Sequence, residues 1–324
     1  MTLSGWLQKK TNKQTSSAPK RGRTNLSARS EEIAGWLFSS PLIIGLLVFT
    51  LTPMVCSLLW SFKDFNGTTK DTWVGLANYV KIFTGDYQMG TVVKNTLIYT
   101  ALSIPINLIL SYLLAWLVNN KHKFTKFFRV LYYLPCVIPA VATGLLWTDM
   151  MDYDFGIFNK ILTAIGLSKF PFFSQESSNI SFTSMFSLLL MNCWSLGSGM
   201  ILWLSAFKNI PSTLYEAAKI DGANAIQRFG HITIPLSTPI IFYNLVTSVI
   251  GTLQYTGTLI IAPRQGKGYD DSLYLYGVKI YFDAFKRGQI GYACSLSWLL
   301  CIVITILTVI LFRSSKWVFY GENA

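Results

Sequence analysis

The most specific residue spacing in the chain lies in one polar loop, residues 208–235, which separates two apolar stretches. Ser212 or Thr213 can cap a short helix there, and Glu216, three residues after Thr213, can complete a capping box. Gly222 can adopt the left-handed backbone conformation that ends a helix, and a second short helix is expected after it. Several small residues leave a surface that the groove of another protein can approach closely, namely Ala217, Ala218, Ala223 and Ala225. The chemistry that this loop suggests is docking.

A second set of polar and aromatic residues recurs at helical spacing inside apolar stretches. One stretch carries Asn244, Ser248, Gly251, Thr252 and Tyr255, and another carries Met191, Trp194, Ser195 and Ser198. Amides and hydroxyls on one helix face can hydrogen-bond a polar solute, and aromatic rings can stack on it. Small and hydroxyl residues also allow close helix packing, and Trp194 and Tyr255 can simply fill core space. Lining of a pathway and packing both remain open for each of these residues.

Other kinds of chemistry have little support in the sequence. The glycines of Gly266-Lys-Gly268 lack the spacing and the following hydroxyl residue of a phosphate-binding loop, so the chain is not expected to hydrolyse ATP or to be an enzyme. His122 and His231 both fall in polar loops, which gives no buried acid–base site. The five cysteines lack metal-ligand spacing and are expected to pack. We expect no metal and no cofactor bound by this chain.

The composition is that of a membrane protein. Of 324 residues 52% are hydrophobic and 13% charged, with a mean hydropathy of +0.42, whereas soluble domains carry about 25% charged residues. Backbone groups in lipid must pair within the chain, so stretches of about 20 apolar residues predict helices. Six such stretches occur: Gly35–Ser61, Asn95–Val118, Arg129–Trp147, Phe182–Leu202, Pro239–Ile261 and Ala293–Phe312. Prolines interrupt the first three and predict kinks, most strongly in the third at Pro135 and Pro139.

The basic residues predict an orientation. With the N-terminal segment placed inside, the 27 Lys and Arg divide 16 to 11 in favour of the cytoplasmic side, so both termini are expected there. The chain then divides into a cytoplasmic tail (1–34), a transmembrane region (35–318) and a short cytoplasmic tail (319–324). A pI near 9.4 therefore needs no nucleic acid. The basic tail is explained by topology, with contact to anionic membrane lipid as the alternative.

The loop also carries a resemblance to a known family. Glu216-Ala-Ala, then Gly222, then Ile232-x-Ile-Pro235 resembles the EAA motif of permease subunits in binding-protein-dependent, ATP-driven importers. Ile234 is a mild departure, because the family usually has Leu before that proline. Further segments are similar to the maltose and glycerol-phosphate permeases of the carbohydrate branch, among them Gly75–Tyr79, Arg129–Pro135, Asp221–Ala223, Asp283–Phe285 and Gly291–Ala293. The resemblance covers residues 35–318.

The resemblance implies an all-α integral membrane protein of six transmembrane helices, a type I-like importer permease with a cytoplasmic coupling helix. It implies a bacterial inner-membrane location and four kinds of partner: a second permease, two ATPase subunits that bind ATP and Mg, an extracytoplasmic solute-binding protein, and a sugar or oligosaccharide, neutral or acidic such as a uronate oligosaccharide. The ATPase-coupling residues would be Glu216, Ala217, Ala218, Gly222 and Pro235. The outer loops, Thr148–Ser181 and Pro263–Tyr292, would meet the binding protein.

Two alternatives accompany these expectations. Loop 208–235 could be a plain connector, with Glu216 a solvated acid and Gly222 an ordinary helix end. The whole chain could instead be a secondary transporter or channel without an ATPase. That class normally needs ionisable residues at mid-membrane or inverted repeats with broken helices, and the six apolar stretches hold essentially no Asp, Glu, Lys or Arg at their cores.

Overall fold

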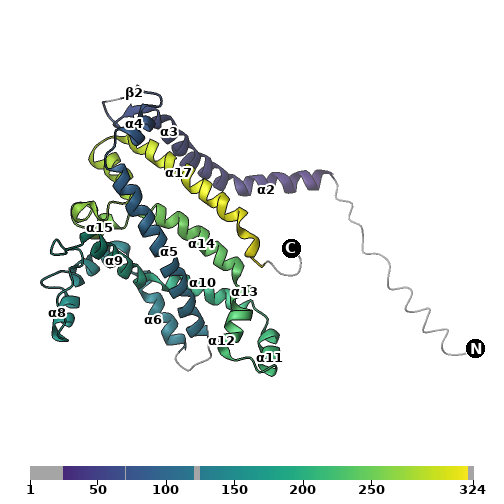
Figure 1. Ribbon diagram of the computed structural model, residues 1–324. Helices are drawn as coiled ribbons and strands as arrows, with labels where there is room; N and C mark the ends of the chain where they lie inside the picture. The colour runs from purple at the N-terminus through teal and green to yellow at the C-terminus, as the bar shows by residue number, and fades with distance from the viewer. Residues whose placement is uncertain (1–24, 70, 120–124, 320–324) are drawn as a thin grey trace, which may run out of the picture. The chain divides into compact units, whose positions relative to one another are not determined.

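The computed structural model describes residues 25–69, 71–119 and 125–319 (Figure 1). By its internal contacts the chain divides into two units, Met1–Cys56 and Ser57–Ala324. Most of the expected N-terminal tail, residues 120–124 with His122, and residues 320–324 lie outside the described residues.

The first unit is helical over all its described residues. Helix α2 (Asn25–Leu46) continues through a π-helical turn, η1 (Leu47–Leu51), into α3 (Thr52–Ser61), whose last residues belong to the second unit. Pro53 has no N–H to donate, which disturbs the regular ladder and accounts for the wide turn just before it. The Thr52 hydroxyl donates to the Leu47 carbonyl, 2.9 Å away, across this turn. Pro41 is accommodated within α2.

Two of the expected spans in the second unit are single long helices. Helix α5 (Met89–Asn119) contains Pro105 without a break, and α17 (Ile290–Arg313) is strongly apolar. With the helix Ser30–Ser61 they are the described helices long and apolar enough to cross a membrane individually.

The other three expected spans are bent pairs. Helices α6 (Thr125–Val137) and α7 (Ala140–Met150) meet at 97°, the strongest bend, where Pro139 stands before α7 in an extended conformation. Helix α9 (Ile180–Asn192) passes through η2 (Cys193–Ser195) into α10 (Gly197–Lys208) at 49°. Counting each bent pair as one span gives the six that the sequence predicts.

The third pair corrects the predicted fifth span. Helix α14 (Thr238–Leu253) follows a segment of α12 (Ala225–Arg228), η3 (Phe229–Thr233) and α13 (Ile234–Leu236) at 66°. It ends at Leu253, and the remainder of the predicted stretch is a turn and the separate short helix α15 (Thr258–Ile261). Pro235 and Pro239 on either side of the bend explain its position, because neither can donate a backbone hydrogen bond.

Short elements connect the spans. A hairpin of β1 (Lys63–Phe65) and β2 (Asp71–Trp73) precedes α4 (Ala77–Thr84). Helix α8 (Ile157–Ala164) follows α7. The late loop folds into η4 (Tyr269–Asp271), α16 (Tyr276–Tyr281) and η5 (Phe282–Lys286), and η6 (Ser315–Trp317) follows α17.

Interior packing relies on polar as well as apolar groups. The Trp203 indole N–H donates to the Ser111 hydroxyl at 2.9 Å, and the Tyr112 and Ser237 hydroxyls lie 2.7 Å apart. At Gly197 a Cβ would collide with the backbone carbonyl of Tyr132, so α10 and α6 approach each other through a position that only glycine permits. Many large apolar side chains are exposed on the outer faces, as lipid contact requires.

Candidate coupling loop and translocation pocket

The polar loop 208–235 is a helix–turn–helix, as its sequence predicts. Helix α11 spans Ser212–Ile220, and Gly222, two residues after its end, has a left-handed φ of +82°. The Ala223 N–H reaches the Ala218 carbonyl at 2.9 Å and the Gly222 N–H reaches the Lys219 carbonyl at 3.2 Å. This pair of bonds is a Schellman ending, which satisfies carbonyls that would otherwise lack partners.

The predicted capping box at Thr213 and Glu216 is wrong. Helix α11 starts earlier, with Pro211 in the cap position and no side-chain cap, so Glu216 is not three residues beyond the cap. A capping box does form on α12, where Asn224 and Gln227 bond to each other's backbone N–H, both at 2.8 Å. Glu216 is exposed and has no hydrogen bond or ion pair with any described residue.

The exposed face of this loop is more apolar than its motif indicates. Ile220 is 86% exposed and Ile226 73% exposed, beside the small residue Ala217. A notch of about 360 Å³ lies between the two short helices, lined by Ala218, Asp221, Gly222, Ala223, Gln227, Arg228, His231 and Ile232. Pro235 lies in α13 and is exposed. Sequence analysis missed Ile220 and Ile226, although two isoleucines flanking a polar turn are a readable signal.

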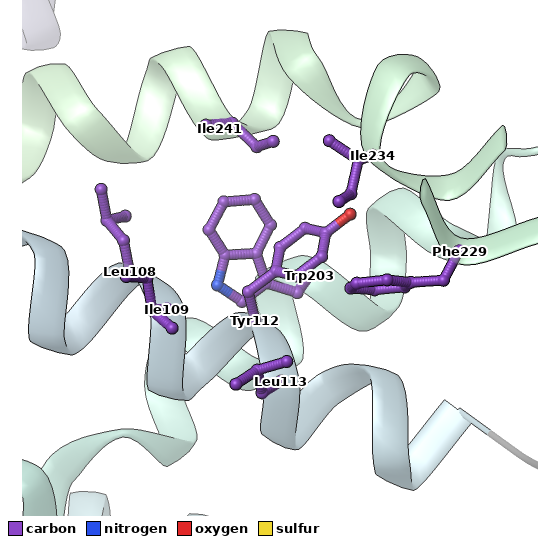
Figure 2. A pocket seen from close by; sticks show the side chains of 8 residues that line it. All are labelled: Leu108, Ile109, Tyr112, Leu113, Trp203, Phe229, Ile234 and Ile241. Carbon is purple, nitrogen blue, oxygen red and sulfur yellow. The ribbon is translucent and has the colours of Figure 1, made fainter. Parts of the chain in front are cut away.

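Aromatic contacts join this loop to the helices above it. Phe229 of η3 packs on Tyr112 and Trp116 of α5, with ring centroids 5.7 and 4.7 Å apart. Figure 2 shows the Tyr112 ring between Trp203 and Phe229. Eight side chains surround an apolar cavity of about 270 Å³ here: Leu108, Ile109, Tyr112, Leu113, Trp203, Phe229, Ile234 and Ile241. The Tyr112–Ser237 bond ties α5 to the bend before α14. A displacement of the loop would therefore also displace α5, α10 and α14.

A polar pocket lies where α5, the α9–α10 break and α14 meet. Its volume is about 240 Å³, and it is lined by Tyr99, Ser103, Ile104, Asn107, Asn192, Ser195, Ser248, Gly251, Thr252 and Tyr255. We refer to this candidate site as the translocation pocket. The Asn192 side-chain amide nitrogen donates to the Tyr99 hydroxyl at 2.8 Å, and the Tyr255 hydroxyl donates to the Asn192 side-chain Oδ1 at 3.4 Å. The two tyrosine rings lie 5.0 Å apart.

Of the nine residues predicted to line a pathway, five lie together in this pocket and four lie elsewhere. Ser195, Ser248, Gly251, Thr252 and Tyr255 line the translocation pocket.

The other predicted residues lie outside the pocket lining. Met191 packs against apolar clusters, and Trp194 lies against Trp147 with centroids 5.8 Å apart. Ser198 donates to a backbone carbonyl, and the Asn244 amide does the same within α14. The break after Asn192 rotates the α10 residues away from the face that an unbroken helix would present.

Helix α5 supplies pocket residues that sequence analysis missed. Tyr99, Ser103 and Asn107 follow i, i+4, i+8, so they form a polar stripe on one face of an otherwise apolar helix. The Asn107 amide donates to the Ser103 carbonyl at 3.0 Å and to its hydroxyl at 3.1 Å. This stripe is visible in the sequence, and only the packing of α5 against α14 and the α9–α10 break shows that it faces a pocket.

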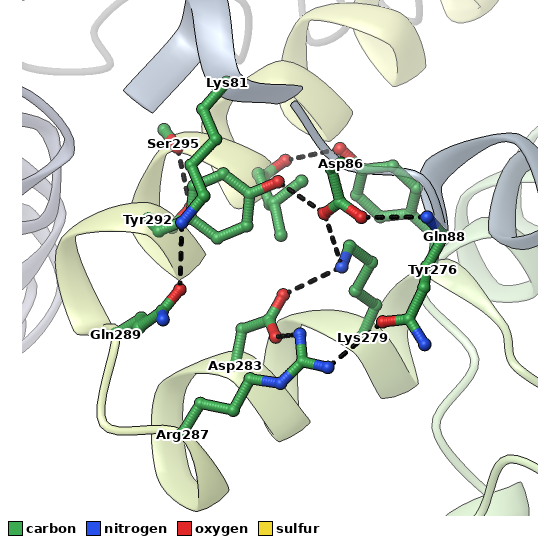
Figure 3. Close-up of polar contacts among 11 residues, drawn as sticks. Lys81, Asp86, Gln88, Tyr276, Lys279, Asp283, Arg287, Gln289, Tyr292 and Ser295 are labelled. Atoms are coloured by element: carbon green, nitrogen blue, oxygen red, sulfur yellow. Dashed lines mark hydrogen bonds and ion pairs between the residues drawn. The ribbon is translucent and has the colours of Figure 1, made fainter. Parts of the chain in front are cut away.

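A buried ionic cluster was also missed. Lys279 of α16 lies 2.7 Å from Asp86 and 3.1 Å from Asp283, and Arg287 lies 2.7 Å from Asp283 (Figure 3). The Tyr292 hydroxyl donates to Asp86 at 2.6 Å. The side chains of Lys279 and Asp283 are fully buried. Two acids and two bases balance, which is how buried charges are tolerated.

The cluster lies outside the six predicted apolar stretches. Lys279, Asp283 and Arg287 are spaced i, i+4, i+8, a readable pattern in a segment that the sequence suggests is a loop. Burial by itself would raise the pKa of Asp86, but the hydrogen bonds and positive charge that Lys279 supplies, with the Tyr292 hydrogen bond, hold that pKa below its ordinary value. These ion pairs join the segment before α5 to α16 and η5. Their role is therefore structural and not that of a proton relay at mid-membrane.

Helix α8 shows an apolar face divided between two environments. Ile157, Ile161 and Ile165 are exposed, as expected of a helix lying on a membrane surface. Phe158 instead packs on Trp147, with centroids 5.5 Å apart. Helix α8 therefore combines an exposed apolar face with one aromatic contact to α7.

Comparisons with known proteins agree with this architecture. Residues 96–318 match the family model described as binding-protein-dependent transport system inner membrane component. A probable ABC transporter permease protein of Bacillus subtilis, YesP, is 37% identical over 300 residues, covering 92% of this chain and 95% of that protein. The lactose transport system permease protein LacF of Rhizobium radiobacter is 30% identical, covering 89% and 96%.

A solved structure shares the fold. A chain of a bacterial alginate ABC transporter, crystallised in complex with an alginate pentasaccharide-bound periplasmic protein, superposes with a TM-score of 0.78 at 23% identity, covering 89% of this chain and 95% of that one. At this identity the likeness shows the type I permease fold. With its family match over most of its length and close relatives over nearly all of it, this chain belongs to the binding-protein-dependent transport system inner membrane component family, as a transport permease subunit.

Proposed function

We propose that this chain forms half of the channel of an ATP-driven importer that takes up a neutral oligosaccharide. The observation that carries the proposal is the translocation pocket. Its lining is mostly hydroxyls, amides and two tyrosine rings, with Ile104 and Gly251 besides, and it has no charged side chain among the described residues. Sugar hydroxyls need such donors and acceptors, and sugar faces stack on aromatic rings. The names of the relatives, lactose and arabinooligosaccharide permeases, support this substrate class.

The proposal includes the partners expected from the family. A second permease would complete the channel, an external solute-binding protein would deliver the sugar, and two ATPase subunits would bind ATP and Mg. In this assignment Glu216, Ala217, Ala218, Gly222 and Pro235 contact an ATPase subunit. Because Phe229 links the loop to α5, and the Tyr112–Ser237 bond links α5 to the start of α14, movement of the ATPase would reach the pocket helices.

Reconstitution tests the proposed function. The four kinds of subunit are placed in proteoliposomes and supplied with a radiolabelled neutral oligosaccharide or a uronate oligosaccharide of the same length. Uptake of the neutral sugar is expected to require ATP and the binding protein. Uptake driven by an ion gradient without ATP would instead establish a secondary transporter, and preference for the uronate would contradict the neutral substrate class.

Topology gives a separate prediction. The 16-to-11 excess of Lys and Arg predicts that both termini and loop 208–235 lie in the cytoplasm. Reporter fusions after Lys63 and after Lys121 are expected to report opposite sides of the membrane, with Lys63 outside. Signals from the same side would contradict this orientation.

A further inference from the structure

A polar cleft of about 450 Å³ lies between the β1–α4 segment and the start of α17. Its lining includes Asn78 and Lys81 from α4 and Arg287, Gln289 and Tyr292 from the later segment. These residues lie near one end of α5 and α17, outside the polar loop 208–235. In the proposed topology this end is external, so the inference rests on the proposed function.

The walls of this cleft are held firmly. The Asn78 amide donates to the carbonyls of Ser61 and Lys63, each at 2.9 Å. A Cβ on Gly291 would collide with the same Lys63 carbonyl, so α17 and β1 are in close contact. On the opposite wall, the buried ionic cluster holds Arg287 through Asp283. A pre-formed polar cleft of this kind needs little ordering when a partner binds.

The two cations that line the cleft, Arg287 and Lys81, differ in whether they have an ion-pair partner. Arg287 pairs with Asp283, and together with Asp86 and Lys279 these residues form a set without net charge (Figure 3). Lys81 instead contacts neutral groups: its Nζ lies 3.3 Å from the Gln289 side-chain oxygen and 4.6 Å from the centre of the Tyr292 ring.

Among the described residues, no carboxylate lies within ion-pair distance of Lys81. Asp64 also lines the cleft, so the described lining carries two cations and one acid. Lys81 is therefore a cation with hydrogen-bonding capacity left over.

We propose that this cleft receives a carboxylate side chain of the solute-binding protein, with Lys81 as its ion-pair partner. A carboxylate would use the donors of Lys81 that Gln289 leaves unoccupied. Because α4, the start of α17 and the ionic cluster are tied together, docking at Lys81 would press on the outer ends of α5 and α17. The cleft thus serves as a charge-selective docking point at the mouth of the channel.

Carbodiimide coupling tests this contact directly, because it joins an amine to a carboxylate that touches it. The complete importer is treated in proteoliposomes with its sugar-loaded binding protein, and coupled peptides are mapped by mass spectrometry. The native chain is expected to couple through Lys81. Lys81→Arg keeps the charge but cannot form this amide, so coupling should disappear while binding-protein-stimulated ATP hydrolysis persists.

Charge reversal tests the energetic role. Lys81→Glu should raise the binding-protein concentration for half-maximal ATPase stimulation by about fivefold or more, because an attraction becomes a repulsion. Lys316→Glu, an exposed lysine of η6 on the cytoplasmic side of the proposed topology, is the matched control and should leave that concentration unchanged. Normal stimulation in Lys81→Glu, or coupling of Lys81 to the second permease, would overturn the inference. Absence of stimulation in the native importer would overturn the proposed function with it.

Discussion

Gly222→Val is expected to reduce binding-protein-stimulated ATP hydrolysis and transport together, by roughly fivefold to thirtyfold. The backbone at Gly222 is left-handed, with φ +82°, and no atom lies within 4 Å of where its Cβ would stand. The penalty therefore comes from strain in the residue's own backbone and not from a clash with another segment, and it is about 1–2 kcal/mol for an L-residue. A shift of that size away from the docking-competent turn corresponds to the stated loss. The measurement is ATPase stimulation in proteoliposomes at matched permease content.

Gly230→Ala is the matched control in the same loop. Gly230 also has open space around its Cβ position, but its backbone does not lie in the left-handed region. This variant should behave like the native chain. If Gly222→Val also kept full stimulation, loop 208–235 would be a connector and the coupling assignment would fail.

Two further substitutions separate docking from folding of the loop. Ile220→Ser removes an apolar side chain that is 86% exposed, so little folded-state packing is lost. Its effect on stimulation would report burial against the ATPase. Glu216→Gln removes a charge that caps nothing and pairs with no described residue, so any loss would likewise come from the partner.

Tyr255→Ala is expected to reduce sugar transport about tenfold or more while leaving binding-protein-stimulated ATP hydrolysis largely intact. The change removes the ring that faces Tyr99 across 5.0 Å and the hydroxyl that reaches Asn192. Loss of an aromatic stacking surface together with an unpaired polar neighbour is worth about 1–3 kcal/mol. Tyr255→Phe keeps the ring and loses only a 3.4 Å hydrogen bond, so it should transport much better than Tyr255→Ala. Uptake of labelled oligosaccharide per ATP hydrolysed is the informative ratio.

A pair of serine substitutions provides the control for the translocation pocket. Ser248→Ala removes a hydroxyl from the pocket lining. Ser198 is not part of that lining, and Ser198→Ala removes a hydroxyl that donates to the backbone carbonyl of Ser195. Uptake should fall in the first and not in the second. Equal effects in the two, or native uptake in Tyr255→Ala, would show that the pocket does not carry the sugar.

Local rules were enough to predict several features from the sequence. Six apolar stretches predict the helical membrane fold, because unpaired backbone groups are not tolerated in lipid. The left-handed turn at Gly222 follows from glycine's lack of a Cβ, and the strongest kink lies at Pro139 because proline cannot continue the hydrogen-bond ladder. Each of these depends on a residue and its chain neighbours alone.

Features that depend on contacts between distant segments were decided only by the tertiary structure. The break after Asn192 turns Ser198 away from the pocket while Ser195 stays in it, which a regular helical repeat does not predict. Lys279 is buried in a late segment that the sequence suggests is a loop, because Asp86, 193 residues earlier, meets it and balances its charge. The helical repeat in a sequence shows which residues share one face of one helix. Whether that face buries a charge or lines a pocket depends on which other segment of the chain packs against it.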